Sequence, residues 1–165
     1  MAETKPDNLI ANLNIGAGVE APAVQAVPTS TKKEPDKAGF YWGTGRRKSS
    51  VARVRIKFGE GKLLINDREL ANYFSREQDR NTVLSPLKAL DMEKKFDIFA
   101  NVNGGGTTGQ AGATMLGIAR ALKNYDLTLV QGMRDGGYLT RDSRMVERKK
   151  PGQSGARKRY QFSKR

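Results

Sequence analysis

Cysteine and histidine are both absent from the 165 residues of this chain. Without cysteine the protein has no disulfide, no thiolate ligand for zinc and no thiolate nucleophile. Without histidine it lacks the side chain best suited to proton transfer near neutral pH, which is also the commonest metal ligand. Most familiar catalytic sites are therefore excluded, and neither a metal nor a cofactor is expected. An enzyme that relies on carboxylates, lysine or serine alone stays open.

Long apolar runs are missing as well. The sequence contains no stretch of about 18 apolar residues, the length needed to cross a bilayer. Its first residues lack the basic segment and the apolar segment of a secretory signal. No arginine precedes Arg46, and this region carries acidic residues, which argues against a mitochondrial transit peptide. We therefore expect a cytoplasmic protein.

Basic residues are in large excess over acidic ones. The chain has 30 Lys and Arg against 17 Asp and Glu, a formal net charge of +13. Such an excess attracts polyanions over long distances, and salt weakens the attraction. Nucleic acid is therefore the first partner class to consider, and an anionic membrane surface is the second.

Composition and charge divide the chain into three segments. Residues 1–38 contain four of the six prolines, no aromatic residue, and 4 basic against 5 acidic residues, so we expect a disordered extension. Residues 39–137 carry a net charge of +6 and nearly all of the apolar periodicity, and we expect one globular RNA-binding domain there. Residues 138–165 carry a net charge of +8 and are predicted to form an extended basic tail.

A clean alternation of side chains predicts a strand from Val51 to Phe58. Its even-numbered positions are apolar and three of its odd-numbered positions are basic, so one face is expected to be buried and the other positively charged. Gly59-Glu60-Gly61 has the composition of a turn. We therefore expect Lys62–Asn66 to return as the second strand of a hairpin.

Helical signals follow this hairpin. Asp67 is predicted to cap a short helix. Ser75 and Gln78 have the spacing of a capping box, which predicts one or two further helical turns. Ser85-Pro86 predicts the start of a separate helix, because proline at the first helical position loses no hydrogen bond.

The second half of the domain is predicted to contain a strand, a glycine-rich loop and a long helix. The alternation from Phe96 to Val102 predicts a third strand. The loop Gly104–Gly109 follows, and apolar residues then recur at helical spacing as far as Tyr125. Asp126 is predicted to cap a last helix that ends at Gly136-Gly137. Strands interleaved with helices predict a small two-layer domain of the α+β or α/β class.

The first candidate site is the basic run that follows Gly43 and Gly45. Glycine lets a partner approach the backbone, and arginine grips phosphate oxygens two at a time. A solvated charged turn would explain this run by itself. The basic face of the predicted strand continues it, however, and six cations on one surface are electrostatically costly without an anion. We therefore predict contact with RNA or DNA through Arg46, Arg47, Lys48, Arg53, Arg55 and Lys57.

The second candidate site is the glycine-rich loop before the long helix. Bare backbone amides at a helix N-terminus form a natural phosphate site, and a nucleic-acid phosphate fits better than a nucleotide cofactor, because no Walker motif is present. Close packing of the helix on the sheet would also explain the small residues, and both explanations stay open. The RNA-contact candidates here are Gly104, Gly105, Gly106 and Gln110.

The third candidate site is the tail. A basic tail that becomes ordered on RNA is the favoured interpretation, and a solubilising or nuclear-import tail is the alternative. Tyr160 and Phe162 are expected either to stack on bases or to pack on the domain. The candidate RNA contacts of the tail are Arg141, Arg144, Arg148, Lys149, Lys150, Arg157, Lys158 and Arg159.

Several motifs, in this order along the chain, carry a family resemblance: Tyr41-Trp42-Gly43-Thr44-Gly45-Arg46-Arg47-Lys48-Ser49-Ser50, Gly104-Gly105-Gly106 with Gly109-Gln110-Ala111-Gly112-Ala113, Arg141-Asp142, Val146-Glu147-Arg148-Lys149-Lys150 and Gln161-Phe162-Ser163-Lys164-Arg165. They resemble the ninth protein of the bacterial small ribosomal subunit, over residues 40–165. Residues 1–38 lie outside this resemblance.

The resemblance implies an α+β fold with a small two-layer βαβ-type domain, similar to the second domain of ribosomal protein five of the small subunit. It implies binding to ribosomal RNA in the head of the subunit, beside neighbouring ribosomal proteins. It also implies that the tail threads through RNA toward the decoding centre. There Ser163, Lys164 and Arg165 would touch the anticodon stem-loop of peptidyl-site tRNA.

The expected function is thus that of a non-catalytic constituent of the small ribosomal subunit that acts in translation. Two other functions stay open from the residues alone. One is an enzyme akin to small-molecule kinases, in which a glycine-rich loop precedes a helix. The other is a general nucleic-acid-compacting protein, which would bind duplex DNA as well as structured RNA.

Overall fold

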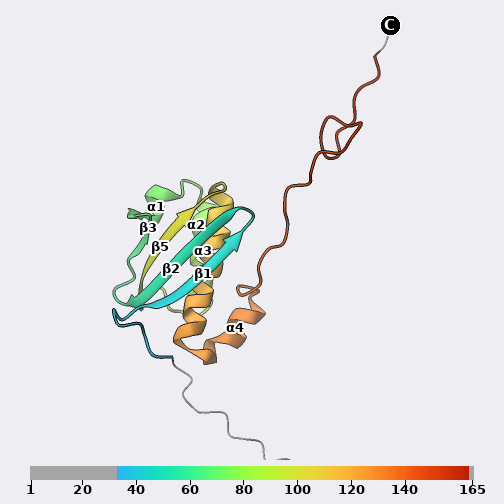
Figure 1. Cartoon of the computed structure of the whole chain (residues 1–165). Helices are drawn as coiled ribbons and strands as arrows, with labels where there is room; N and C mark the ends of the chain where they lie inside the picture. Colours follow the sequence, from blue (N-terminus) through green and yellow to red (C-terminus); the bar gives the residue numbers. More distant parts are fainter. Residues whose placement is uncertain (1–32, 164–165) are drawn as a thin grey trace, which may run out of the picture.

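The computed structural model describes residues 33–163, which form one sheet with helices and a long C-terminal segment (Figure 1). Residues 1–32 and 164–165 lie outside the described residues, and with them most of the predicted N-terminal extension and the candidates Lys164 and Arg165. The strands are β1 (Tyr41–Arg47), β2 (Ser50–Phe58), β3 (Leu63–Ile65), β4 (Arg68–Glu69) and β5 (Phe96–Asn103). The helices are α1 (Leu70–Tyr73), α2 (Glu77–Lys88), α3 (Thr107–Tyr125), the 3-10 turn η1 (Leu127–Leu129) and α4 (Val130–Asp135).

The five strands form a mixed sheet in the order β1-β2-β5-β3-β4. Strand β2 is antiparallel to both β1 and β5, whereas β3 runs parallel to β5 and antiparallel to β4. The chain crosses from β3 to β5 through α1 and α2, which gives the βαβ unit. Helix α3 packs on β1 and β2 and α2 packs beside α3, so the helices cover one face of the sheet and leave the other open (Figure 1). The predicted two-layer α+β fold is confirmed.

The core lies between the sheet and α3, and the predicted alternations define it. Ala52, Val54 and Ile56 of β2 are fully buried, and Phe96, Ile98, Ala100 and Val102 of β5 are almost fully buried. Phe58 is the exception, because it lies at the end of β2 and is 61% exposed. Helix α3 contributes Ala111, Ile118, Ala119 and Leu122, and Phe74, Val83, Leu87 and Met133 add to the core from other elements.

Strand β1 has no counterpart among the strands predicted from the sequence. Its buried positions are Tyr41, Gly43 and Gly45, and two glycines among three positions conceal the apolar alternation. The glycines are there because α3 lies directly against them. A Cβ at Gly45 would overlap the carbonyl oxygen of Ala113 and lie 2.5 Å from the amide nitrogen of Gly117. Backbone-to-backbone packing therefore replaces side-chain packing at this place.

The predicted hairpin between Val51–Phe58 and Lys62–Asn66 is wrong. The partner of β2 in the antiparallel hairpin is β1, and β3 pairs instead with β5 and β4. Asp67 does not cap a helix either. Asn66 and Asp67 have φ angles of 48° and 63° and form the two-residue turn between β3 and β4. Two successive positive φ angles are what a tight hairpin turn of type I′ requires.

Helix α2 is one continuous helix rather than the two that the sequence predicts. The predicted capping box is wrong, because the helix begins at Glu77 and Arg76 at its N-cap makes no side-chain hydrogen bond. Pro86 does not start a new helix. Its missing N–H would have bonded to the carbonyl of Thr82, and the Ser85 hydroxyl donates to that oxygen instead, at 2.8 Å. The helix therefore tolerates proline in its last turn.

The outer edge of β1 is covered by side chains of α3. The Arg120 guanidinium donates to the carbonyl oxygen of Thr44 at 2.7 Å, and the Asn124 amide donates to that of Trp42 at 2.8 Å. These bonds satisfy two strand carbonyls that have no neighbouring strand to bond to.

Asp97 organises the connection between β2 and β3. One of its carboxylate oxygens accepts hydrogen bonds from the backbone N–H groups of Glu60, Gly61 and Lys62, at 3.0, 3.2 and 3.0 Å. The bond from Lys62 contributes most to lowering the pKa of the Asp97 carboxyl below its ordinary value. A carboxylate is favoured because three donors point at it.

We expect Asp97→Asn to lower the free energy of unfolding at pH 7 by about 1 kcal/mol, because the donors then face a neutral oxygen. The lowered pKa means that this contribution is complete above the unfolded-state pKa of about 3.9 and fades as the pH falls below it. Denaturant unfolding at pH 7 and pH 3 measures both effects, and the difference between the two proteins should shrink at pH 3. Glu60→Gln, a charge loss in the same loop, is the control.

Candidate nucleic-acid interface

The open face of the sheet carries the cations of β1 and β2. Arg46 and Arg53 are exposed, and Arg55 and Lys57 are half-buried, all on the side away from the helices. Asp97 is the only acidic residue in β1, β2 or β5, and its carboxylate is occupied by the β2–β3 loop. The basic face predicted from the alternation is thus present, and its charge is nearly uncompensated.

Two aromatic rings hold the innermost cations of this face. Phe40 and Phe99 meet edge to face, with ring centroids 6.1 Å apart. The guanidinium carbon of Arg55 lies 5.2 and 5.3 Å from their centroids, and the ammonium nitrogen of Lys57 lies 5.8 and 5.7 Å away. Cation–π attraction restrains both side chains, which lowers the entropy that they lose on binding an anion.

These aromatic rings were not among the predicted site residues. The signal for Phe99 lies in the strand predicted from Phe96 to Val102, because every second residue of that strand must face outward. Phe40 gives no comparable signal, since it precedes a strand that the alternation does not reveal.

The run Arg46-Arg47-Lys48 does not lie on one surface. Arg46 is on the open face, and Lys48, with a φ angle of 51°, is in the exposed turn between β1 and β2. Arg47 falls on the opposite side of β1, so the expectation of six cations on one surface is wrong for this residue. Successive residues of a strand point to opposite faces, and no strand was predicted over this run.

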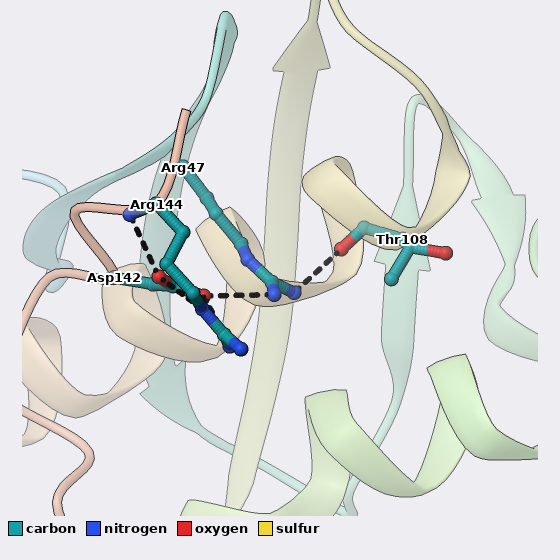
Figure 2. A network of polar contacts seen from close by, with 4 residues as sticks. All are labelled: Arg47, Thr108, Asp142 and Arg144. Atoms are coloured by element: carbon teal, nitrogen blue, oxygen red, sulfur yellow. Dashed lines mark hydrogen bonds and ion pairs between the residues drawn. The ribbon is translucent and has the colours of Figure 1, made fainter. Parts of the chain in front are cut away.

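Arg47 is part of a polar network that we call the clasp, formed by Arg47, Thr108, Asp142 and Arg144 (Figure 2). The Arg47 guanidinium bonds the Asp142 carboxylate at 2.8 Å and donates to the carbonyl oxygen of Thr108 at 3.2 Å. The Arg144 guanidinium bonds the same carboxylate at 2.9 Å. The clasp therefore joins the end of β1, the first turn of α3 and the first part of the C-terminal segment.

A glycine makes room for the clasp. A Cβ at Gly112 would lie 2.5 Å from Cδ of Arg47, so the arginine side chain runs directly over the helix backbone. The side-chain hydrogen bond from Arg144, followed by its backbone N–H and with a smaller contribution from Arg47, holds the pKa of the Asp142 carboxyl well below its usual range. The carboxylate is thus charged throughout the physiological range.

We expect Asp142→Asn to loosen the start of the C-terminal segment without unfolding the domain. The amide cannot form two ion pairs, so Arg47 and Arg144 lose their shared partner. Backbone amides of residues 138–144 should then exchange hydrogen severalfold faster, whereas those of β2 and β5 should not change. Glu147→Gln removes a carboxylate further along and should leave residues 138–144 as they are. Unchanged exchange in both variants would refute the role of the clasp.

The glycine-rich loop is braced from three sides. Gly104 and Gly105 have φ angles of 73° and 66°, which favour glycine. The Gly104 carbonyl accepts from the Ser50 hydroxyl and from the Gln110 side chain, both at 3.1 Å. Gln110 also accepts from the Tyr73 hydroxyl at 2.8 Å. Gln110 is a predicted RNA contact, but both polar atoms of its side chain are hydrogen-bonded within the domain.

Close packing explains the small residues that follow the loop. A Cβ at Gly117 would lie 2.5 Å from Cγ2 of Val54, and Gly117 is buried. The loop itself is exposed from Gly104 to Thr108, and α3 begins without a side-chain cap at Gly106. Packing therefore accounts for the glycines of α3, Gly109, Gly112 and Gly117, and a phosphate at the exposed amides of the loop stays a prediction.

The C-terminal segment leaves the domain after Tyr138 and Leu139, which still pack on the core (Figure 1). Residues 141–150 form no helix or strand. Farther along, the Arg157 guanidinium bonds the Glu147 carboxylate through two nitrogens, at 2.6 and 3.0 Å, and closes a loop over residues 147–157. This arginine lowers the pKa of the Glu147 carboxyl.

The predicted tail contacts thus fall into two groups. Arg144 and Arg157 pair with carboxylates of the tail itself. The other candidates within the described residues are exposed: Arg141, Arg148, Lys149, Lys150, Lys158, Arg159 and Ser163.

A family model described as "Ribosomal protein S9/S16" matches residues 45–165, most of the chain. The chain belongs to this family. It is therefore a structural protein of the small ribosomal subunit that binds ribosomal RNA and serves translation, and the resemblance stated from the motifs is confirmed. The matched span includes β2, the glycine-rich loop, the clasp and the C-terminal segment, whereas Phe40 and Trp42 precede it. Among residues 33–163, no helix has the length and apolar character of a membrane span.

Proposed function

We propose that this ribosomal protein holds RNA at two separate places. The open sheet face would bind phosphates of ribosomal RNA in the head of the small subunit, next to neighbouring ribosomal proteins. The tail would thread through RNA, and Ser163, Lys164 and Arg165 would touch the anticodon stem-loop of peptidyl-site tRNA, in cytoplasmic ribosomes. The observation that carries the proposal is the division of the unpaired cations between the open face and a segment that runs away from the domain.

The charge of the open face supports phosphate binding. Within the described residues, Arg46, Lys48 and Arg53 form no ion pair, and Arg55 and Lys57 are restrained on aromatic rings. Phosphate contacts fix the position and orientation of a protein on folded RNA without reading base edges. This is the interaction that a structural constituent of a ribonucleoprotein needs.

The reach and the charge of the tail support a distant contact. Residues 138–165 carry a net charge of +8. At roughly 3.3–3.6 Å per extended residue, residues 151–165 alone could span about 50 Å. Cations on such an arm lower the repulsion between packed RNA strands. The clasp fixes the point at which the arm starts.

Deleting Lys164 and Arg165 tests the tRNA contact. We expect small subunits to assemble nearly normally, because the open face and the rest of the tail are intact. Peptidyl-site tRNA should dissociate several times faster from the purified ribosomes, and reading-frame errors should rise, because two cations next to the anticodon stem-loop are lost. Lys149→Gln with Lys150→Gln removes the same charge from the middle of the tail. Equal tRNA dissociation and equal frameshifting in the deleted and intact proteins would exclude the contact.

A further inference from the structure

Trp42 is a large aromatic side chain that the fold leaves exposed on the open face. Its neighbours Tyr41 and Gly43 are buried against the helices, so Trp42 lies on the other side of β1, where 47% of it is exposed. Its partner across β2 is Arg55, and Arg55 is paired with Phe99 on β5. An aromatic, a cationic and an aromatic side chain thus form one row across three strands.

The next row of the face is polar. Thr44, Arg53 and Asn101 are partners across the same three strands, and all three are exposed. A hydroxyl, a guanidinium and an amide offer both donors and acceptors. The face therefore combines three kinds of group: an aromatic surface, fixed cations, and neutral groups that could bond to the edges of bases.

We propose that the open face binds an unpaired segment of RNA, with one base stacked on the indole of Trp42 and the adjoining phosphates held by Arg55 and Lys57. The proposal rests on the proposed function, because it assumes that this face binds RNA. Duplex RNA would use the cations but not the indole, since its bases already stack on one another. An unpaired strand offers both bases and phosphates, which is how single-stranded nucleic acid is commonly bound.

The chain carries its own probe for this contact, because Trp42 is its only tryptophan. The full-length protein is titrated at 0.15 M salt with a labelled unpaired 12-nucleotide RNA, with a 12-base-pair RNA duplex, and with inorganic polyphosphate. We expect saturable quenching of Trp42 emission by the unpaired RNA alone, since only a stacked base reaches the indole. All three polymers should bind, as the anisotropy of labelled RNA and its competition by polyphosphate report.

Trp42→Ala should weaken binding of the unpaired RNA about 5- to 100-fold, the effect of losing one base–aromatic stack. Binding of the duplex and of polyphosphate should change less than about twofold, because neither contact involves stacking. Trp42→Phe keeps an aromatic ring and should recover most of the affinity, which separates stacking from damage to the fold. Leu127→Ala removes a partly exposed apolar side chain of η1, outside the open face and the tail, and is the control.

Two results would overturn the inference. One is emission that the unpaired RNA does not quench. The other is a Trp42→Ala protein that binds all three polymers as the intact protein does. If neutralising Arg46, Arg53, Arg55 and Lys57 still weakened binding in that case, the face would bind phosphates only and the proposed function would stand. If neutralisation also had no effect, the face would be available to a protein neighbour, and both proposals would fail.

Discussion

We expect Gly45→Ala to destabilise the domain more than alanine at any other glycine of the domain would. The new Cβ would overlap the carbonyl oxygen of Ala113 and crowd the amide nitrogen of Gly117. Both obstacles are backbone atoms of α3, and neither can rotate away as a side-chain end would. The helix must therefore move off the sheet, which separates the core residues of β2 from those of α3.

Overpacking of a well-packed core costs about 1–3 kcal/mol, occasionally more, and we expect Gly45→Ala to reach at least the upper end of this range. For a domain of this size, about 3 kcal/mol lowers the midpoint of thermal unfolding by more than about 10 °C. Gly106→Ala is the matched control, because a Cβ there has nothing within 4 Å and its φ of −113° suits any residue. Similar midpoints for the two variants would contradict backbone-to-backbone packing of β1 on α3.

Neutralising the open face is expected to have the largest effect on RNA binding. The variant carries four changes to glutamine, at Arg46, Arg53, Arg55 and Lys57. If each cation contacts one phosphate, the slope of log affinity against log salt should fall by about three to four. At 0.15 M salt we expect affinity for a fragment of small-subunit RNA to fall about 100-fold, and incorporation into subunits to fall with it.

The matched control removes four positive charges elsewhere, by changing Lys88, Lys94, Lys95 and Lys123 to glutamine. These lysines are exposed and lie on the helices or in the turn before β5. Filter binding at several salt concentrations and sedimentation of ribosomal particles provide the two measurements. If both variants lost the same affinity and slope, the total charge would matter and the sheet face would not. Normal incorporation of the first variant would exclude the face as a principal contact.

The sequence predicts best those elements whose side chains alternate or recur with large apolar residues. The strand at Val51–Phe58 and the helix ending at Tyr125 follow from such patterns. Strand β1 does not, because Gly43 and Gly45 occupy its buried positions, and glycine carries no apolar signal. The predicted hairpin failed for a different reason. Neighbours in sequence were assumed to pair, whereas β5, about forty residues after β2, takes the place beside it.

The candidate site was predicted in the same uneven way. Cations at alternate positions identify the basic face, since one strand contains the whole pattern. The clasp could not be predicted, because Arg47 meets partners 61 and 95 residues away. Arg47 also shows that a run of like residues need not act together. Side chains alternate along β1, so Arg46 points toward solvent and Arg47 toward α3.

The hydrogen bonds from Arg120 and Asn124 to the edge of β1 affect how the protein behaves before it binds RNA. An open strand edge is a template on which a second chain can build a continuous sheet, the first step in aggregation. Here the two side chains occupy the carbonyls that an incoming strand would need. The two bonds therefore disfavour edge-to-edge pairing at β1 before RNA binds, while the cationic face stays free for the transcript.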